Sequence, residues 1–247
     1  PALARQAADG SAPWPNGLRE IHPFWMLRHL SNNAHALLAA DLGARGDGAT
    51  YGGGNAGAQA LAAAAWALRA GAIDTAIVVG YDSLLEPELL VELTERGDAT
   101  TAEPSAIVAP YAATAAGFVP GEAAAALVLV RVDDPRARAA RATVAAVASV
   151  GELPEVATTL APSRDAILLD GAAVARPQVD LAERTALASL APHALLTATA
   201  AGLGHTGAAA SLVQTIALTL ALERRTAPPI AGLVDPAPGP LVPITSP

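Results

Sequence analysis

The stretch GGGNAGAQALAAAAWALRAGAIDTAIVVG, residues 52–80, decides the fold class. Its Gly57–Ala70 segment is almost wholly alanine and leucine, which predicts a helix that is small on every side and buried between layers. Gly71 is a helix-stop signal. Thr75–Gly80 then carries an uninterrupted apolar core, which is typical of a strand covered on both faces. The stretch therefore predicts a helix-to-strand unit of a layered α/β protein.

Helical and strand patterns alternate along the rest of the chain. The spacing of apolar residues predicts a short amphipathic helix over Leu30–Leu42. Further strands are predicted at Ala123–Val132, Thr143–Val150, Ala166–Asp170 and Leu195–Ala198, and further helices at Asp180–Leu190 and Gly207–Arg224. A polar loop, residues 95–104, separates the first two strands. We expect residues 1–247 to form a single domain, with an irregular arm at residues 1–30 and a proline-rich tail at residues 225–247.

The composition excludes several kinds of chemistry. None of the 247 residues is cysteine, which removes disulfides, zinc–thiolate sites and thiol nucleophiles. All 15 basic residues are arginine, so lysine chemistry is excluded as well. The net charge of −8 argues against a nucleic acid or an anionic membrane surface as the main partner. The sequence shows no membrane-spanning segment and no signal peptide, and its first residue is Pro1 rather than Met. We therefore expect a cytoplasmic fragment or processed chain with no membrane insertion and no bound metal.

Residues Gly52–Gly57 match the G-x-G-x-x-G pattern, in which glycines let a pyrophosphate approach a helix N-terminus. That pattern requires a buried strand directly before it. Residues 43–51 are too rich in glycine and charge for such a strand. The match therefore leaves a nucleotide-binding oxidoreductase as an alternative rather than as the main hypothesis.

Two ionisable residues lie where structural and functional roles compete. His205 precedes the predicted helix Gly207–Arg224, where backbone N–H groups and the helix dipole keep an imidazole neutral. Glu122 follows a tight turn and precedes a buried strand, so its charge needs a partner. For Glu122 we favour a structural glutamate that accepts backbone N–H bonds over a catalytic acid. For His205 both roles stay open.

The order and spacing of four segments together resemble the β-ketoacyl synthases of the thiolase-like superfamily. Leu30–Gly46 is similar to the helix before the family's active-site loop, and Gly57–Ser83 to its nucleophile helix and the strand behind it. Gly117–Glu122 is close to the family's G-F-V-x-G-E-G turn, and Gly204–Ala210 resembles its G-H-x-x-G-A-A-G helix. The resemblance implies an α/β fold with the thiolase-like five-layer αβαβα arrangement. It also implies shortening at both ends, because the family's first strands and final G-F-G-G-T-N turn have no counterpart.

The resemblance also places the family's catalytic positions on this sequence. The nucleophilic cysteine falls on Gly54, the first catalytic histidine on Ala172, and the lysine on Ala200. Ala172 is located by the pair Asp180 and Glu183, since the family's histidine lies eight residues before an Asp-x-x-Glu. Of the four catalytic positions, only His205 keeps the family's residue. Three further residues are expected to support the site, namely Asn55, Phe118 and Glu122.

Condensation by this chain alone is therefore not expected, because no thiolate can hold the acyl group and no His and Lys can stabilise the enolate. The pattern resembles a chain-length-factor type subunit, which implies a dimer with an active ketosynthase, an acyl carrier protein as further partner, and no cofactor. One alternative is a thioester hydrolase or decarboxylase that uses His205 with Glu122 or Asp82. The other is a nucleotide-binding oxidoreductase built on Gly52–Gly57.

Overall fold

The computed structural model describes Phe24, Leu30, residues 32–147 and residues 167–245. The chain forms two compact units, residues 1–50 and residues 51–247. Apart from Phe24 and Leu30, the predicted irregular arm lies outside the described residues.

The described part of the first unit contains one α-helix, α3 (Asn33–Asp41). It confirms that a helix lies within Leu30–Leu42, with shorter bounds, but none of its residues is buried and the predicted amphipathic character is not seen. Gly43 follows with a φ of +61°, a left-handed conformation that glycine adopts without strain, and the helix ends there.

The second unit is built from two short sheets and the helices around them. β1 (Thr75–Ser83) pairs antiparallel with β2 (Glu122–Val130), from Thr75 opposite Val130 to Ser83 opposite Glu122. β3 (Leu168–Asp170) pairs in parallel with β4 (Leu195–Thr197). The helices and 3-10 turns, in chain order, are α4 (Ala56–Arg69), α5 (Pro87–Glu95), η2 (Pro104–Ala106), η3 (Pro135–Ala139), α7 (Pro177–Leu190), α8 (Ala200–Leu203), η4 (Gly207–Ala209) and α9 (Ala210–Arg224).

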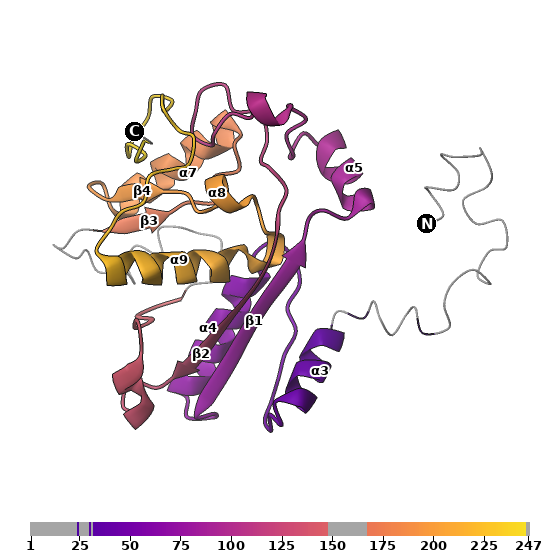
Figure 1. Cartoon of the computed structure of the whole chain (residues 1–247). Coiled ribbons are helices and arrows are strands. Elements are labelled where there is room, and N and C mark those ends of the chain that lie inside the picture. Colours follow the sequence, from indigo (N-terminus) through magenta and orange to yellow (C-terminus); the bar gives the residue numbers. More distant parts are fainter. Residues whose placement is uncertain (1–23, 25–29, 31, 148–166, 246–247) are drawn as a thin grey trace. The chain divides into compact units, whose positions relative to one another are not determined.

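Helices α4 and α9 lie between the two sheets (Figure 1). α4 packs on β1, while α9 contacts both β2 and β3, and α7 lies on the far side of the β3–β4 sheet. The N-terminal ends of α4 and α9 approach closely because Gly57 has no side chain. A Cβ at Gly57 would lie 2.6 Å from Ser211 Oγ and 2.9 Å from the carbonyl oxygen of Ala208. This close approach places the starts of both central helices at one point of the fold.

Two apolar clusters stabilise the second unit. The first joins α4, β1, β2 and α9 through Leu61, Val78, Ala125 and Leu212. The second lies around β4 and includes Tyr111, Leu196, Ile230, Leu233 and Leu241. The last three of these belong to the proline-rich tail predicted at residues 225–247, so the described part of that tail packs into a core.

The prediction that the apolar strand is covered on both faces is wrong, and the helix predicted to be buried between layers is exposed at Trp66. On the outer face of the β1–β2 sheet, Ile77 is 47% exposed and Val128, its cross-strand partner, is 69% exposed. On α4, Trp66 is 71% exposed. An apolar run fits a strand covered on both faces, but successive side chains point to opposite faces, and only one face of this sheet meets α4 and α9.

Two other segments differ from their predictions. Residues 143–147 form no strand, and residues 148–150 of the strand predicted at Thr143–Val150 lie outside the described residues. The sequence stretch before the predicted polar loop contains α5, which was missed. Pro87 at the first turn of α5 is a helix-start signal, because a proline there removes an N–H that has no partner in any case. Among the described residues, no helix is long and apolar enough to cross a membrane.

Candidate functional site

A cavity of about 220 Å³ lies where α4 and α9 begin. All four positions that the sequence resemblance assigns to the family's catalytic residues line it. Gly54 precedes α4, Ala172 follows β3, Ala200 starts α8, and His205 precedes η4. The remaining lining residues are Asn55, Ala58, Thr199, Leu203, Gly204, Thr206, Ala210, Ser211, Val213 and Gln214. Positions far apart in the sequence therefore meet around one space.

His205 is held by its backbone and by its ring. Its N–H donates to the carbonyl oxygen of Val119 (2.8 Å), and its own carbonyl oxygen accepts from the N–H of Gly121 (2.9 Å). The N–H of Gly207 donates to His205 Nδ1 (3.3 Å), so the neutral ring carries its proton on Nε2. The ring of Phe118 lies 4.6 Å away, centroid to centroid. His205 is thus oriented to donate a hydrogen bond through Nε2.

The pKa of His205 is lowered by burial, and the Asp82 carboxylate partly opposes that effect. Burial disfavours the charged imidazolium, so the neutral ring dominates near pH 7. The predicted neutral state is therefore supported, although its main cause is burial rather than the helix dipole.

Asp82 fixes the turn that carries His205. Its Oδ2 accepts from the N–H of Ala208 (2.7 Å), and its Oδ1 accepts from the N–H of Ser83 (2.9 Å). Gly207 has a φ of +52°, and a Cβ there would lie 2.1 Å from Asp82 Oδ2. This position therefore requires glycine. The sequence analysis named Asp82 only as an alternative partner of His205, whereas the structure gives it this anchoring contact at the start of η4.

The three predicted supporting residues occupy different places. Asn55 lines the cavity, and its side-chain oxygen accepts from Gln59 Nε2 on the next turn of α4. Phe118 packs on His205 and does not line the cavity. Glu122 is exposed at the start of β2, and its carboxylate accepts from Ser83 Oγ (2.9 Å). Glu122 was predicted to accept bonds from backbone N–H groups, whereas in the structure its partner is the hydroxyl of Ser83.

A carboxylate on α7 fixes the cavity wall at Ala172. Glu183 Oε1 accepts from the N–H of Ala172 (2.6 Å), and Glu183 Oε2 accepts from the N–H of Ala173 (3.3 Å) and the hydroxyl of Tyr111 (2.8 Å). Ala173 has a φ of +51°, a strained conformation for a residue with a Cβ. The sequence analysis used Glu183 only as a landmark. Its position three residues after Asp180 on one helix face was the available signal for a shared role.

A second carboxylate joins β3 to α8 near the cavity. Asp170 Oδ1 accepts from the N–H of Thr199 (2.8 Å), and Asp170 Oδ2 accepts from the Thr199 hydroxyl. Gln214 on α9 donates to the carbonyl oxygen of Gly171 (2.9 Å). Burial raises the pKa of Asp170, and the bonds from Thr199 partly oppose this rise. These contacts hold β3, α8 and α9 around the cavity.

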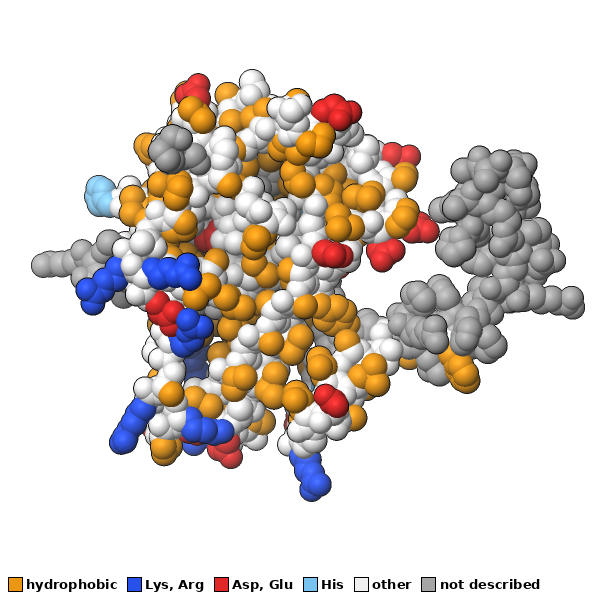
Figure 2. Space-filling view, in the orientation of Figure 1, with side chains coloured by type: hydrophobic (Ala, Val, Ile, Leu, Met, Phe, Trp, Pro, Cys, Tyr) orange, Lys and Arg blue, Asp and Glu red, His pale blue; other side chains and the backbone are white. Residues whose placement is uncertain are grey.

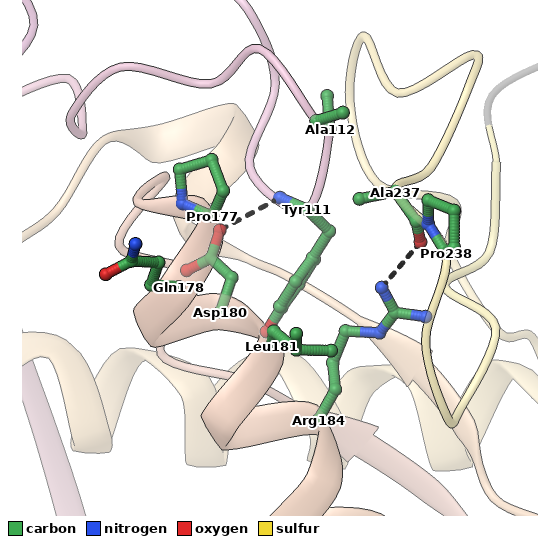
Figure 3. A pocket seen from close by; sticks show the side chains of 10 residues that line it. Tyr111, Ala112, Pro177, Gln178, Asp180, Leu181, Arg184, Ala237 and Pro238 are labelled. Atoms are coloured by element: carbon green, nitrogen blue, oxygen red, sulfur yellow. Dashed lines mark hydrogen bonds between the residues drawn. The ribbon is translucent and has the colours of Figure 1, made fainter.

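A second cavity, also of about 220 Å³, lies between α7 and the C-terminal segment (Figure 3). Arg184, which is buried, donates through Nη1 to the carbonyl oxygen of Ala237 (2.8 Å) and through Nε to those of Pro240 and Leu241 (both 3.0 Å). Asp180 Oδ2 accepts from the N–H of Tyr111 (3.1 Å). Burial raises the pKa of Asp180 and lowers that of Arg184. These side chains bond to the protein's own backbone, so they connect α7 to neighbouring segments.

Among the described residues that line it, the first cavity offers hydrogen-bond donors and three hydroxyls but no thiol and no amine. Its donors are His205 Nε2–H and the N–H groups at the start of α4, which favour a carbonyl oxygen or a carboxylate. Ser211 Oγ is buried and has no partner among the described residues. Across residues 32–147 and 167–245, no group of three or more His, Asp or Glu side chains is arranged to bind a metal ion. Residues 44–50 form no strand, so the loop Gly52–Gly57 lacks the element that a dinucleotide site needs.

Two family models match the chain in tandem. The "Beta-ketoacyl synthase, N-terminal domain" matches residues 4–134, and the "Beta-ketoacyl synthase, C-terminal domain" matches residues 138–234. The chain belongs to the β-ketoacyl synthase family. The resemblance seen in the sequence is thereby confirmed, and the α/β fold is that of the thiolase-like ketosynthases.

Curated relatives of this synthase-family chain come from polyketide biosynthesis. It is 32% identical over 202 residues to "Putative polyketide beta-ketoacyl synthase 2" of Streptomyces halstedii, covering 72% of this chain and 49% of the relative. It is 31% identical over 206 residues to "Tetracenomycin polyketide synthase ketoacyl synthase beta subunit" of Streptomyces glaucescens, covering 74% of this chain and 50% of the relative. The chain thus spans about half the length of the curated relatives it matches.

Solved ketosynthase structures share the fold. One is a type II polyketide synthase acyl-carrier protein in complex with its ketosynthase bound to the hexaketide. It has a TM-score of 0.85 and 20% identity, and the match covers 99% of this chain and 67% of that one. Another is the ishigamide ketosynthase/chain length factor, with a TM-score of 0.78, 21% identity, and coverage of 98% and 64%. At these identities the likeness establishes the fold.

Proposed function

We propose that this chain is a catalytically degenerate β-ketoacyl synthase-like subunit of fatty-acid or polyketide-type biosynthesis, of the chain-length-factor type. One observation carries the proposal. Gly54, Ala172 and Ala200 stand together around a cavity that keeps only His205 of the four catalytic positions. The relative named as a ketoacyl synthase beta subunit supports the same assignment.

Chemistry also favours a non-condensing role. Acyl transfer to the protein requires a nucleophile at the start of α4, and Gly54 has no side chain. The described residues nearest the cavity offer the hydroxyls of Thr199, Thr206 and Ser211, but no thiol and no amine. What the cavity retains is shape and hydrogen-bond donors. The chain would therefore shape an acyl pocket while its partner supplies the reaction.

The partner in this proposal is an active ketosynthase, with an acyl carrier protein delivering the acyl chain. The open apolar face of β1–β2 supports such pairing, because Ile77 and Val128 are exposed there. Among the described residues, β1 is paired along one edge only, and an unpaired edge can accept a further strand. We propose in addition that residues 1–247 act as one cytoplasmic domain with the five-layer arrangement shortened at both ends.

Reconstitution tests the proposal. The chain alone, given acyl- and malonyl-carrier proteins, is expected to form no acyl-enzyme and no condensation product. Mixed with an active ketosynthase from its host, it is expected to form a stable complex and to change the length of the product chain. Radiolabel transferred onto this chain, or a product distribution identical with and without it, would contradict the assignment.

A second candidate function is decarboxylation of a malonyl thioester, favoured by the orientation of His205. Since Gly207 occupies Nδ1, Nε2–H is the donor available to a thioester carbonyl oxygen. When the bond to the carboxylate carbon breaks and releases CO₂, that oxygen gains the negative charge of the enolate, which then takes a proton from water. Release of CO₂ from malonyl-carrier protein by the isolated chain, lost in His205→Ala, would favour this function over a purely structural subunit.

A further inference from the structure

The arginines of the second unit are concentrated on one part of its surface. Figure 2 shows most of the blue side chains at the left and lower left of the view, and the red ones mainly at the top and right. Seven of the ten described arginines from residue 51 onward belong to this region, which we call the arginine patch. Its members lie on the segment 131–141 and at the C-terminal ends of α4 and α9, namely Arg69, Arg131, Arg136, Arg138, Arg141, Arg224 and Arg225.

The charge balance differs sharply between the patch and the rest of the unit. Four carboxylates accompany the seven arginines of the patch, namely those of Asp74, Asp133, Asp134 and Glu223. In the other described residues from 51 onward, three arginines stand against twelve carboxylates. A protein with a net charge of −8 thus carries one area of positive excess.

Ion pairs and hydrogen bonds link the patch into one continuous area. Arg131 pairs with Asp74 (3.1 Å), just before β1, and with Asp133 (3.2 Å). Arg141 pairs with Glu223 near the end of α9, and Arg69 at the end of α4 donates to the carbonyl oxygen of Ala145 (3.0 Å). The segment 131–147 therefore connects the C-terminal ends of both central helices.

Several of these charges have no carboxylate partner in the described residues. Arg136 holds the pKa of Asp134 at about 2, so that pair is ionised and neutral overall at pH 7. Arg138, Arg224 and Arg225 are exposed, and none of them forms an ion pair within 4 Å among the described residues, although Arg224 helps to lower the pKa of the neighbouring Glu223. Arg224 benefits from the negative end of the α9 dipole, but Arg138 lies on no α-helix. Helix capping therefore explains only part of the patch.

Exposed apolar side chains accompany the arginines. Trp66 is 71% exposed and lies three residues before Arg69 on α4, a spacing that makes the two side chains neighbours. Val132 and Leu222 are 79% and 65% exposed and adjoin Arg131 and Glu223 in the chain. Tryptophan and arginine are the residues most enriched where proteins bind one another. The patch thus has the composition of a protein interface.

The patch lies away from the candidate cavity. α4 and α9 begin at the cavity and end at the patch, and their 14 and 15 residues span about 21 and 23 Å. A partner on the patch would dock without entering the cavity. Such a partner is therefore defined by its surface charge rather than by an acyl group.

From these observations we propose that the arginine patch docks a protein whose surface is rich in carboxylates, with Trp66 as the apolar contact beside Arg69. The four interspersed carboxylates disfavour a polyphosphate backbone, which would meet repulsion at each of them. An acidic protein surface carries its charges at discrete points and can place them opposite Arg138, Arg224 and Arg225. This inference goes beyond the proposed function and does not depend on the chemistry of the cavity.

Binding to poly-L-glutamate, a soluble model of a carboxylate-rich surface, tests the proposal on the full chain. Wild type is expected to bind with an affinity that falls as salt rises, and the variant R138E/R224E/R225E to bind at least about tenfold more weakly. Tryptophan emission is expected to shift on binding in wild type and to shift less in Trp66→Phe. Circular dichroism identifies any variant that fails to fold.

Arg45→Glu is the matched control, because Arg45 is exposed, lies in the first unit and is not part of the patch. Single variants Arg138→Glu and Arg45→Glu are compared at equal ionic strength, and only the first is expected to weaken binding. Equal weakening by both, an unchanged affinity of the triple variant, or tighter binding to duplex DNA or phosphatidylserine vesicles than to polyglutamate would overturn the proposal.

Discussion

The reactive positions of the candidate cavity and the frame that holds them have opposite character. Gly54, Ala172 and Ala200, which the family resemblance assigns to three of the four catalytic positions, carry at most a methyl group. The frame keeps its polar contacts, including Asp82 to Ala208 and Glu183 to Ala172. A cavity whose walls are held this firmly without reactive groups is suited to define a shape. The contrast separates the fold of a ketosynthase from its reaction.

The largest loss of stability is expected when the contacts that Glu183 makes in the frame are removed. Glu183→Ala leaves the N–H groups of Ala172 and Ala173 and the hydroxyl of Tyr111 without their acceptor. Because Glu183 is only partly buried, water replaces some of these bonds, and the free energy of unfolding is expected to fall by about 3 kcal/mol. Urea denaturation measures it. Glu88→Ala on α5 is the control and is expected to change stability by less than about 0.5 kcal/mol.

The next effect concerns the close approach of α4 and α9. Gly57→Ala places a Cβ against Ser211 Oγ and the backbone of Ala208, so one helix must shift. The gain in helix propensity offsets part of the strain, and the expected loss is about 1–2 kcal/mol by urea denaturation. A melting temperature equal to or above that of wild type would show that the helices separate here without cost.

Local patterns predicted the elements of this unit well where one physical signal dominated. The alanine and leucine run of α4 and the apolar cores of β1 and β2 were each identified within a few residues. Gly71, with a φ of +68°, ended its helix as expected. The four positions assigned as catalytic by the family resemblance lie around one cavity, although no local pattern linked them.

What the sequence did not predict depends on tertiary partners. The exposure of Ile77 and Trp66 follows from which faces the neighbouring elements cover, and apolar composition carries no information about that. The contact of Glu183 with Ala172 requires a strained loop at Ala173 that no propensity favours. The Asp82 anchor likewise spans 126 residues, from β1 to η4.

A smaller effect is expected in the pH dependence of stability that His205 contributes. Burial lowers the pKa of His205 in the folded protein below 6.5, so the unfolded chain takes up this proton at a higher pH than the folded one. The stability from keeping His205 neutral is therefore fully present above about pH 6.5 and is lost as pH falls through that value toward the folded pKa. His205→Gln lacks this dependence. Between pH 7.5 and 5 the free energy of unfolding of wild type should therefore fall relative to that of the variant, as measured by urea titrations.

The smallest structural effect, and the sharpest test of the contrast, is expected at Gly54. In contrast to Gly57, a Cβ at Gly54 meets no atom within 4 Å, and its φ does not lie in the left-handed range. Gly54→Cys is therefore expected to change the free energy of unfolding by less than about 0.5 kcal/mol. The new thiol at the start of α4 should react with iodoacetamide, since it would lie on the cavity.

Condensation is nevertheless expected to stay absent in Gly54→Cys, because Ala172 and Ala200 still provide neither the imidazole nor the amine that the second half-reaction uses. Mass spectrometry after incubation with acyl- and malonyl-carrier proteins detects both an acyl adduct on the protein and a condensed product. An acyl adduct without condensed product fits a frame that preserves geometry after losing its reactive groups. A condensed product from this single change would mean that His205 and the cavity walls suffice for the reaction, and the separation between frame and chemistry would fail.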